Sequence, residues 1–170
     1  MTTKHHITVQ VNGQTHERDV EPRRLLCDML RTDLHLRGVR VGCEHGVCGS
    51  CTVLLDGEPI RSCTTLAVQV DDGDVETVES LAGEDGGLHP LQESFSACHA
   101  LQCGYCTPGF LMTLKPAYDS GLKPDRAQIR ELISGNLCRC TGYQQIVEAV
   151  ERAFRLRDGV EPAGDLGAQA

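Results

Sequence analysis

Eight of the ten cysteines in this 170-residue chain fall into two groups with the close spacing of metal ligands. In the first group three cysteines share one glycine-rich loop, and a fourth follows the next hairpin: Cys43, Cys48, Cys51 and Cys63. Thiolates that converge from one short loop need unusual backbone angles, which the glycines of that loop permit. The C-x4-C-x2-C spacing is that of plant-type [2Fe–2S] sites. It predicts a cluster of this kind in the first half of the chain.

The second group combines a C-x2-C pair with a C-x-C pair farther along the chain: Cys103, Cys106, Cys138 and Cys140. Cys106 and Cys140 each directly precede a threonine, which we expect to cap the start of a helix. Two helix N-termini would then face one site, where free N–H groups and positive dipole ends favour thiolates. The sequence therefore predicts a second cluster site that is assembled from two distant segments.

Two other uses of clustered cysteines stay open on the residues alone. Disulfides are typical of exported proteins, but the chain begins without an apolar leader-like segment and holds no long apolar run. We therefore expect a cytoplasmic, reducing location, with a buried disulfide pair as the alternative for the second group. Structural zinc is the alternative for the first group, although zinc sites usually pair two short cysteine knuckles.

The other two cysteines have different expected roles. Cys27 lies beside Leu26 in a helical pattern, which predicts a buried small side chain. Cys98 lies on one helical face with Leu91 and Phe95, which favours core packing. A ligand role for Cys98 stays open, because the C-x4-C-x2-C spacing recurs from this residue onward.

The charge of the chain excludes one class of partner. The formal net charge is −8, and no long run of lysine and arginine is present. Nucleic-acid binding needs a basic surface that can neutralise phosphates. We therefore expect no nucleic-acid partner.

The first half of the chain has the pattern of a small α+β unit. Apolar and polar side chains alternate over 7–11 and 15–20, with the turn signal Asn12-Gly13 between these two expected strands. A helix is expected to begin at Pro22, in a segment that Gly38 ends, and a second hairpin is expected at 52–55 and 59–62 around Asp56-Gly57. A short helix at 64–68 and a strand or extended exit at 75–81 complete this half. Hairpins rather than crossovers predict an α+β fold.

The second half has a helical pattern. A polar, glycine-rich stretch at 82–88 is the best domain boundary. Helices are expected from about 91 to 98, from Thr107 to about Gly121, from about Asp125 to Gly135, and after Thr141, where a capping box is expected. The expected domains are 1–81 and 82–158, and the apolar-poor end, 159–170, is expected to be a disordered tail.

Four segments of the chain resemble one known family. They are Gly-Cys-Glu-His-Gly-Val-Cys-Gly-Ser-Cys-Thr-Val from residue 42, Arg-Ser-Cys from 61, Leu-Gln-Cys-Gly-Tyr-Cys-Thr-Pro-Gly-Phe from 101 and Ser-Gly-Asn-Leu-Cys-Arg-Cys-Thr-Gly-Tyr from 134. They resemble the small iron–sulfur subunit of molybdenum hydroxylases, the family of xanthine oxidase and aerobic carbon monoxide dehydrogenase. The resemblance covers about residues 5–155. It implies an N-terminal ferredoxin-like β-grasp domain and a C-terminal four-helix bundle domain, each with one [2Fe–2S] cluster.

The resemblance also implies a function, cofactors and partners. Such a chain relays electrons from a molybdopterin site on a large subunit to FAD on a medium subunit, commonly in a dimer of heterotrimers. Gln102 matches the residue that contacts the pterin, which is expected in its cytosine dinucleotide form. No catalytic residue and no membrane span are expected in the chain itself. A freestanding two-cluster redox carrier is the alternative, and likeness alone favours an N-heteroaromatic substrate for the complex.

Overall fold

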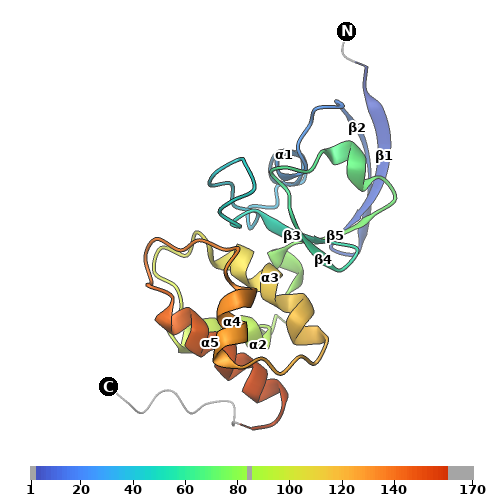
Figure 1. Ribbon diagram of the computed structural model, residues 1–170. Helices are drawn as coiled ribbons and strands as arrows, with labels where there is room; N and C mark the ends of the chain where they lie inside the picture. The colour runs from blue at the N-terminus through green and yellow to red at the C-terminus, as the bar shows by residue number, and fades with distance from the viewer. Residues whose placement is uncertain (1–2, 84–85, 161–170) are drawn as a thin grey trace.

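The computed structural model describes residues 3–83 and 86–160, in which a sheet half and a helical half lie end to end (Figure 1). The sheet half contains β1 (His5–Val11), β2 (Gln14–Val20), α1 (Leu26–Asp28), β3 (Thr52–Leu55), β4 (Glu58–Arg61) and β5 (Asp74–Glu76). The helical half contains α2 (Pro90–Ala97), α3 (Thr107–Asp119), α4 (Arg126–Leu132) and α5 (Gln144–Arg157). The fold is therefore of the expected α+β class.

The five strands form one mixed sheet in the order β2-β1-β5-β3-β4. Both predicted hairpins are confirmed, because β1 pairs antiparallel with β2 and β3 pairs antiparallel with β4. Their turns have positive φ at Asn12 and Gly13 and at Asp56 and Gly57, as a type I′ turn requires. β5 joins the two hairpins, running parallel to β1 and antiparallel to β3. The sequence did not predict this parallel pairing, because local turn signals carry no information about it.

The helix expected from Pro22 begins later and is irregular. α1 covers only Leu26–Asp28, and a π-helical turn, Met29–Asp33, continues it. Leu25 is held in an extended conformation by a β-bridge to Leu66, so the chain cannot enter a helix before that point. The short helix expected at 64–68 is a 3-10 helix at Ala67–Val70, and a further 3-10 turn, Val78–Ser80, follows β5.

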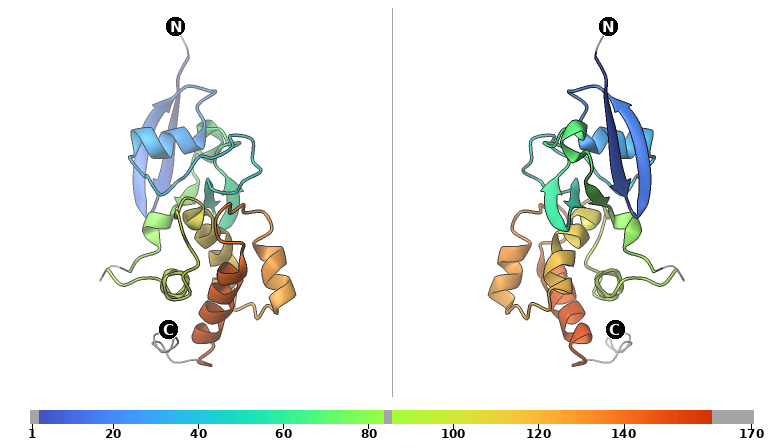
Figure 2. Two further views of the ribbon diagram at one scale, coloured as in Figure 1. Left: turned by 90° about the vertical axis from the view of Figure 1, so that its left-hand side faces the viewer. Right: turned by 90° about the vertical axis from the view of Figure 1, so that its right-hand side faces the viewer.

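The helical half packs against the sheet half. Figures 1 and 2 show α2–α5 gathered at one end of the molecule, with the strands at the other. α5 packs against α2 and α4, while α3 packs against β3 and β4. Leu54 of β3 belongs to the same buried core as Phe110 and Leu114 of α3. The two halves therefore share apolar packing and are held in one orientation by it.

The expected link at 82–88 and the expected tail at 159–170 lie partly outside the described residues. Positions 84 and 85 of the expected link and 161–170 of the expected tail are not described. Among the described residues, no helix combines the length and the apolar character needed to cross a membrane.

Candidate metal centres

The first cysteine group lies in the loop 42–51 and at the end of β4. Cys51 and Cys63 are buried, whereas Cys43 and Cys48 are half-buried. Glu44, Gly46 and Gly49 have positive φ, which gives this loop its tight curvature. The predicted reason for the glycines is therefore confirmed at Gly46 and Gly49.

The four thiols of the first group associate in two pairs. The Cys43 thiol interacts with that of Cys48, and the Cys63 thiol interacts with that of Cys51. The backbone N–H of Cys48 also donates to Cys43 Sγ at 3.4 Å. Two-by-two association is the arrangement that two neighbouring irons need, since each iron of a four-cysteine [2Fe–2S] site takes two thiolates.

The two thiol pairs differ in how strongly their surroundings stabilise a thiolate. Backbone N–H groups of Cys48 and His45 lower the pKa of Cys43 to about 6, because they stabilise its negative charge. Burial, followed by the neighbouring Cys51 thiol, raises the pKa of Cys63 to about 12. The loop therefore stabilises a thiolate at Cys43, whereas Cys63 needs an added positive charge, such as a metal, to ionise at neutral pH.

The second cysteine group is also paired, and it lies nearer the surface. The Cys140 thiol donates to Cys103 Sγ at 3.6 Å, and both residues are exposed. The half-buried thiols of Cys106 and Cys138 form the other pair. Both halves of the second predicted site are thus brought together by the fold.

The thiols of the second group have pKa values shifted in both directions. Burial, followed by the Cys138 thiol, raises the pKa of Cys106 to about 12. Burial alone would raise the pKa of Cys138, but hydrogen bonds from the hydroxyl and N–H of Thr141, from the N–H of Cys140 and from the Cys106 thiol together lower it. The contact with Cys103 raises the pKa of Cys140. Thr141 is therefore the residue that most directly stabilises a thiolate here.

The expected threonine caps at this site are wrong. The N-cap of α3 is Cys106 itself, and Thr107 is the first helical residue, without a side-chain cap. α5 begins only at Gln144 after Tyr143, which has φ 69°. The Thr141 hydroxyl instead donates to Cys138 Sγ at 3.2 Å and accepts from the backbone N–H of Tyr143. α5 starts later than expected because Gly142 and Tyr143 both hold positive φ, which interrupts helical geometry after Thr141.

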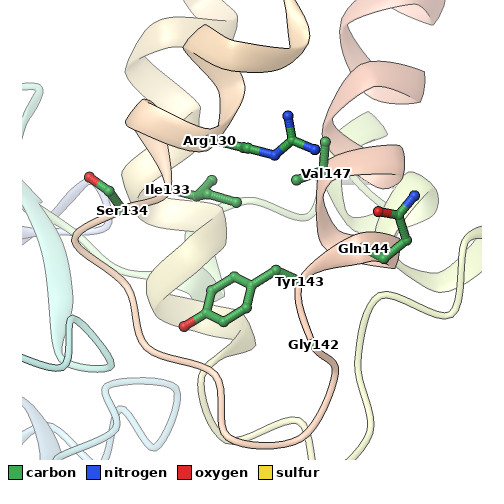
Figure 3. A pocket seen from close by; sticks show the side chains of 7 residues that line it. All are labelled: Arg130, Ile133, Ser134, Gly142, Tyr143, Gln144 and Val147. Atoms are coloured by element: carbon green, nitrogen blue, oxygen red, sulfur yellow. The ribbon is translucent and has the colours of Figure 1, made fainter.

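The hydroxyl of Tyr143 forms hydrogen bonds with the backbone at and just before the C-x-C segment. Its ring projects from the start of α5 toward the loop before Cys138 (Figure 3). Its hydroxyl accepts the backbone N–H of Cys138 at 2.8 Å and donates to the carbonyl of Asn136. A cavity of about 300 Å³ lies beside this ring, lined by no cysteine. The sequence motif includes Tyr143 but does not predict these hydrogen bonds, because they depend on the left-handed backbone conformation of Tyr143.

The two cysteine groups are joined by direct backbone contact. The N–H of Leu137 donates to the carbonyl of Cys48 at 2.9 Å. Leu137 is adjacent to Cys138, so one hydrogen bond links neighbouring positions of the two groups. The Tyr105 hydroxyl adds a second link by donating to the carbonyl of Val41 at 2.7 Å.

The remaining candidates of the sequence are placed as follows. Cys27 is buried as predicted, with 1% exposure. Cys98 ends α2 and packs at the edge of the helical core, which agrees with the packing role. His45 is exposed and contacts the Cys43 carbonyl through its ring nitrogen. Gln102 is exposed beside Cys103.

The donors around the thiols fit an iron–sulfur group. The N–H of Cys48 approaches Cys43 Sγ, and the Thr141 hydroxyl donates to Cys138 Sγ. N–H and O–H donors to sulfur of this kind stabilise the negative charge of a [2Fe–2S] cluster. Within 3–83 and 86–160, no three side chains of His, Cys, Asp or Glu are grouped as ligands of one metal ion.

Comparisons with known proteins agree with this chemistry. A 2Fe-2S iron-sulfur cluster binding domain matches residues 9–89, and a [2Fe-2S] binding domain matches residues 77–151. The chain is 71% identical to the 6-hydroxypseudooxynicotine dehydrogenase complex subunit beta of Paenarthrobacter nicotinovorans, covering 89% of this chain and 95% of that protein. It is 56% identical to the caffeine dehydrogenase subunit gamma of Pseudomonas sp. (strain CBB1), covering 88% and 90%.

A solved structure extends the likeness to three dimensions. The chain matches a chain of quinoline 2-oxidoreductase from Pseudomonas putida 86 with a TM-score of 0.84 and 47% identity. The match covers 94% of this chain and 99% of that one. With its paired thiols and these relatives, the chain belongs to the family of small [2Fe–2S] iron–sulfur subunits of molybdenum hydroxylases.

Proposed function

We propose that this chain is the electron-transfer subunit of a molybdenum hydroxylase complex. It receives electrons from a molybdopterin site on a large subunit and passes them to FAD on a medium subunit. The observation that carries this proposal is the pair of four-thiol sites in direct backbone contact through Cys48 and Leu137. A relay needs two adjacent redox sites, whereas substrate chemistry needs a pocket that holds reactive groups.

The ligands of the first cluster are Cys43, Cys48, Cys51 and Cys63, and those of the second are Cys103, Cys106, Cys138 and Cys140. Bound [2Fe–2S] clusters would supply one-electron carriers at the two sites. The chain itself spaces the thiols, aims N–H and O–H donors at them and excludes water from the Cys51–Cys63 pair. Such contacts, together with burial, set the potential of an iron–sulfur centre.

The second site faces the molybdenum subunit in this proposal. Cys103 and Cys140 are exposed, and so are the apolar side chains of Leu101, Tyr105 and Leu137. Apolar side chains around an exposed ligand pair are typical of a surface that a partner covers. Gln102 lies in this surface and is the proposed contact to the pterin. The first site, by exclusion, lies toward the flavin.

The finer organisation follows the same family pattern. We propose a ferredoxin-like β-grasp domain at 1–81, a four-helix bundle domain at 82–158 and a tail at 159–170. The described strands all precede position 82, and α2–α5 all lie between 90 and 157, which supports this division. The proposed complex is a cytoplasmic dimer of heterotrimers whose pterin is the cytosine dinucleotide form.

The substrate of the complex is proposed to be a nitrogen heterocycle or a related alkaloid. The support is the names of the similar proteins, which mention 6-hydroxypseudooxynicotine, caffeine and quinoline. No residue of this chain is assigned to substrate.

Iron analysis and EPR of the protein purified with its partner chains test the function. We expect about four irons per chain and two distinct reduced-cluster signals. Substrate should reduce both clusters when the large subunit is present. Zinc-loaded protein without an EPR signal would contradict the metal assignment. Purification of the chain free of any molybdenum or flavin subunit would instead favour a freestanding carrier.

A further inference from the structure

One buried side chain ties the loops of the two cysteine groups together. Asn136 is only 1% exposed, and its side-chain NH2 donates to the carbonyl of Gly49 at 3.1 Å. Its side-chain oxygen accepts the Thr113 hydroxyl at 2.9 Å. Its backbone carbonyl accepts from Tyr143, and its N–H donates to the carbonyl of Ile133. Asn136 therefore hydrogen-bonds to the loop 42–51, to α3 and to the start of α5, as well as to Ile133 in its own turn.

The backbones of the two loops approach each other closely at this contact. A Cβ atom on Gly49 would lie 2.5 Å from the Gly135 carbonyl oxygen and 2.6 Å from the Asn136 side-chain nitrogen. A Cβ on Gly109, in the first turn of α3, would lie 2.3 Å from the Gly49 carbonyl oxygen. Glycine is the residue that permits such close approach of two backbones. The loop 42–51 is thus seated between Asn136 and the start of α3.

The same contact lies next to the proposed ligands on both sides. Gly49 follows Cys48, and Asn136 precedes Leu137 and Cys138. The hydrogen bond from Leu137 to Cys48 lies alongside the one from Asn136 to Gly49. A shift of either loop at Asn136 would change the separation of the two thiol groups. Arg61 supports the contact from β4 by donating to the carbonyl of Gly135 at 2.8 Å.

We propose that Asn136 is a positioning residue for electron transfer between the two metal centres. Its buried amide fixes the loop 42–51 against the segment 135–140 and so fixes the distance and orientation between the two four-thiol sites. Electron tunnelling falls steeply with distance, so a small displacement changes the rate without changing either site. This proposal rests on the electron-relay function proposed above.

The test uses the intact complex with Asn136→Ala. Iron content and both EPR signals should be retained, because no ligand is changed. The magnetic splitting between the two reduced clusters, which reports their distance and orientation, should be weakened or lost. In stopped-flow reduction by substrate, the second site should fill at the wild-type rate and the first site severalfold more slowly.

Two further variants separate positioning from general stability. Asn12→Gly is the control in a different place, the β1–β2 turn. It removes a side chain that also joins two segments, through hydrogen bonds to Thr77. It should lower Tm and leave splitting and transfer rates unchanged. Thr113→Val removes only the hydroxyl that holds the Asn136 oxygen. It should weaken the splitting in the same direction but less than Asn136→Ala, whereas Thr113→Ser should behave as wild type.

The possible results are distinct. Unchanged splitting and unchanged filling of the first site in Asn136→Ala, with a lower Tm only, would overturn the proposal. So would loss of a cluster in both Asn136→Ala and Thr113→Val, because the contact would then serve cluster assembly. If the wild type shows both EPR signals, neither of these results contradicts the relay function. A wild-type complex without two clusters would instead refute the relay itself.

Discussion

The hydroxyl of Thr141 donates to Cys138 Sγ at 3.2 Å, and the backbone N–H of Thr141 approaches the same sulfur at 3.4 Å. Both donors come from the residue that the sequence assigned to a helix cap. They lower the pKa of Cys138 despite its partial burial. The same donors would stabilise the extra negative charge that a bound cluster gains on reduction.

Thr141→Val should therefore lower the reduction potential of the second centre. A loss of about 1 kcal/mol of stabilisation of the reduced state corresponds to about 40 mV for a one-electron couple. A redox titration followed by EPR measures the shift. Thr141→Ser, which keeps the hydroxyl, should keep the wild-type potential, and the first centre should not shift in either variant. An unchanged potential in Thr141→Val would show that the hydroxyl does not tune the centre.

Cys106→Ala should remove one cluster and leave the other. Cys106 is paired with Cys138 at the second site, so its loss deprives one iron of a ligand. We expect about two irons per chain and loss of only one EPR signal. Cys98→Ala is the matched control and should keep both signals, because Cys98 packs at the edge of the helical core. Loss of a signal in this control would mean that Cys98 is a ligand.

Gln102→Ala should slow entry of electrons into the chain. Gln102 is exposed next to Cys103, and its proposed partner is the pterin of the large subunit. Rapid-mixing experiments should show slower reduction of the second centre by substrate, whereas dithionite should reduce both centres as in the wild type. Equal slowing with both reductants would point to damage at the cluster instead. Wild-type rates with substrate would contradict the pterin contact.

His89 should make stability fall on the acid side of neutrality. Its Nδ1 accepts the N–H of Leu91 at 3.2 Å, which requires the neutral ring, and burial lowers the pKa of His89 from 6.5. The folded state then binds fewer protons than the unfolded state. Stability is therefore complete above the unfolded pKa of 6.5 and is lost as the pH falls through the lower folded pKa.

The pH effect of His89 can be separated from that of cluster loss. Thermal unfolding at about pH 7.5 and about pH 5.5 should show a smaller decrease in Tm for His89→Asn than for the wild type. Asparagine keeps an N-cap acceptor but does not titrate. Any acid loss of clusters affects both proteins alike. An equal decrease in Tm would show that His89 does not contribute.

Much of the local structure could be predicted from short-range signals. The two hairpins followed from Asn12-Gly13 and Asp56-Gly57, because these pairs accept positive φ. The start of α4 followed from Asp125, whose carboxylate accepts the N–H of Gln128 and so caps the helix. The start of α1 could not be predicted, because the bridge between Leu25 and Leu66 joins residues far apart in the chain. The Thr141 cap was wrong because Gly142 and Tyr143 have positive φ, so α5 begins only at Gln144.

The sequence by itself determined the thiol inventory, its spacing and the α+β class, since each of these depends on residue types and local periodicity. Only the tertiary structure decided how the thiols pair, which pairs are exposed, and that Leu137 and Asn136 hold the two groups in contact through Cys48 and Gly49. Those relationships depend on close approach of segments that are 87 residues apart in the case of Gly49 and Asn136. Close approach is set by core packing around residues such as Leu54 and Phe110, which no local pattern records.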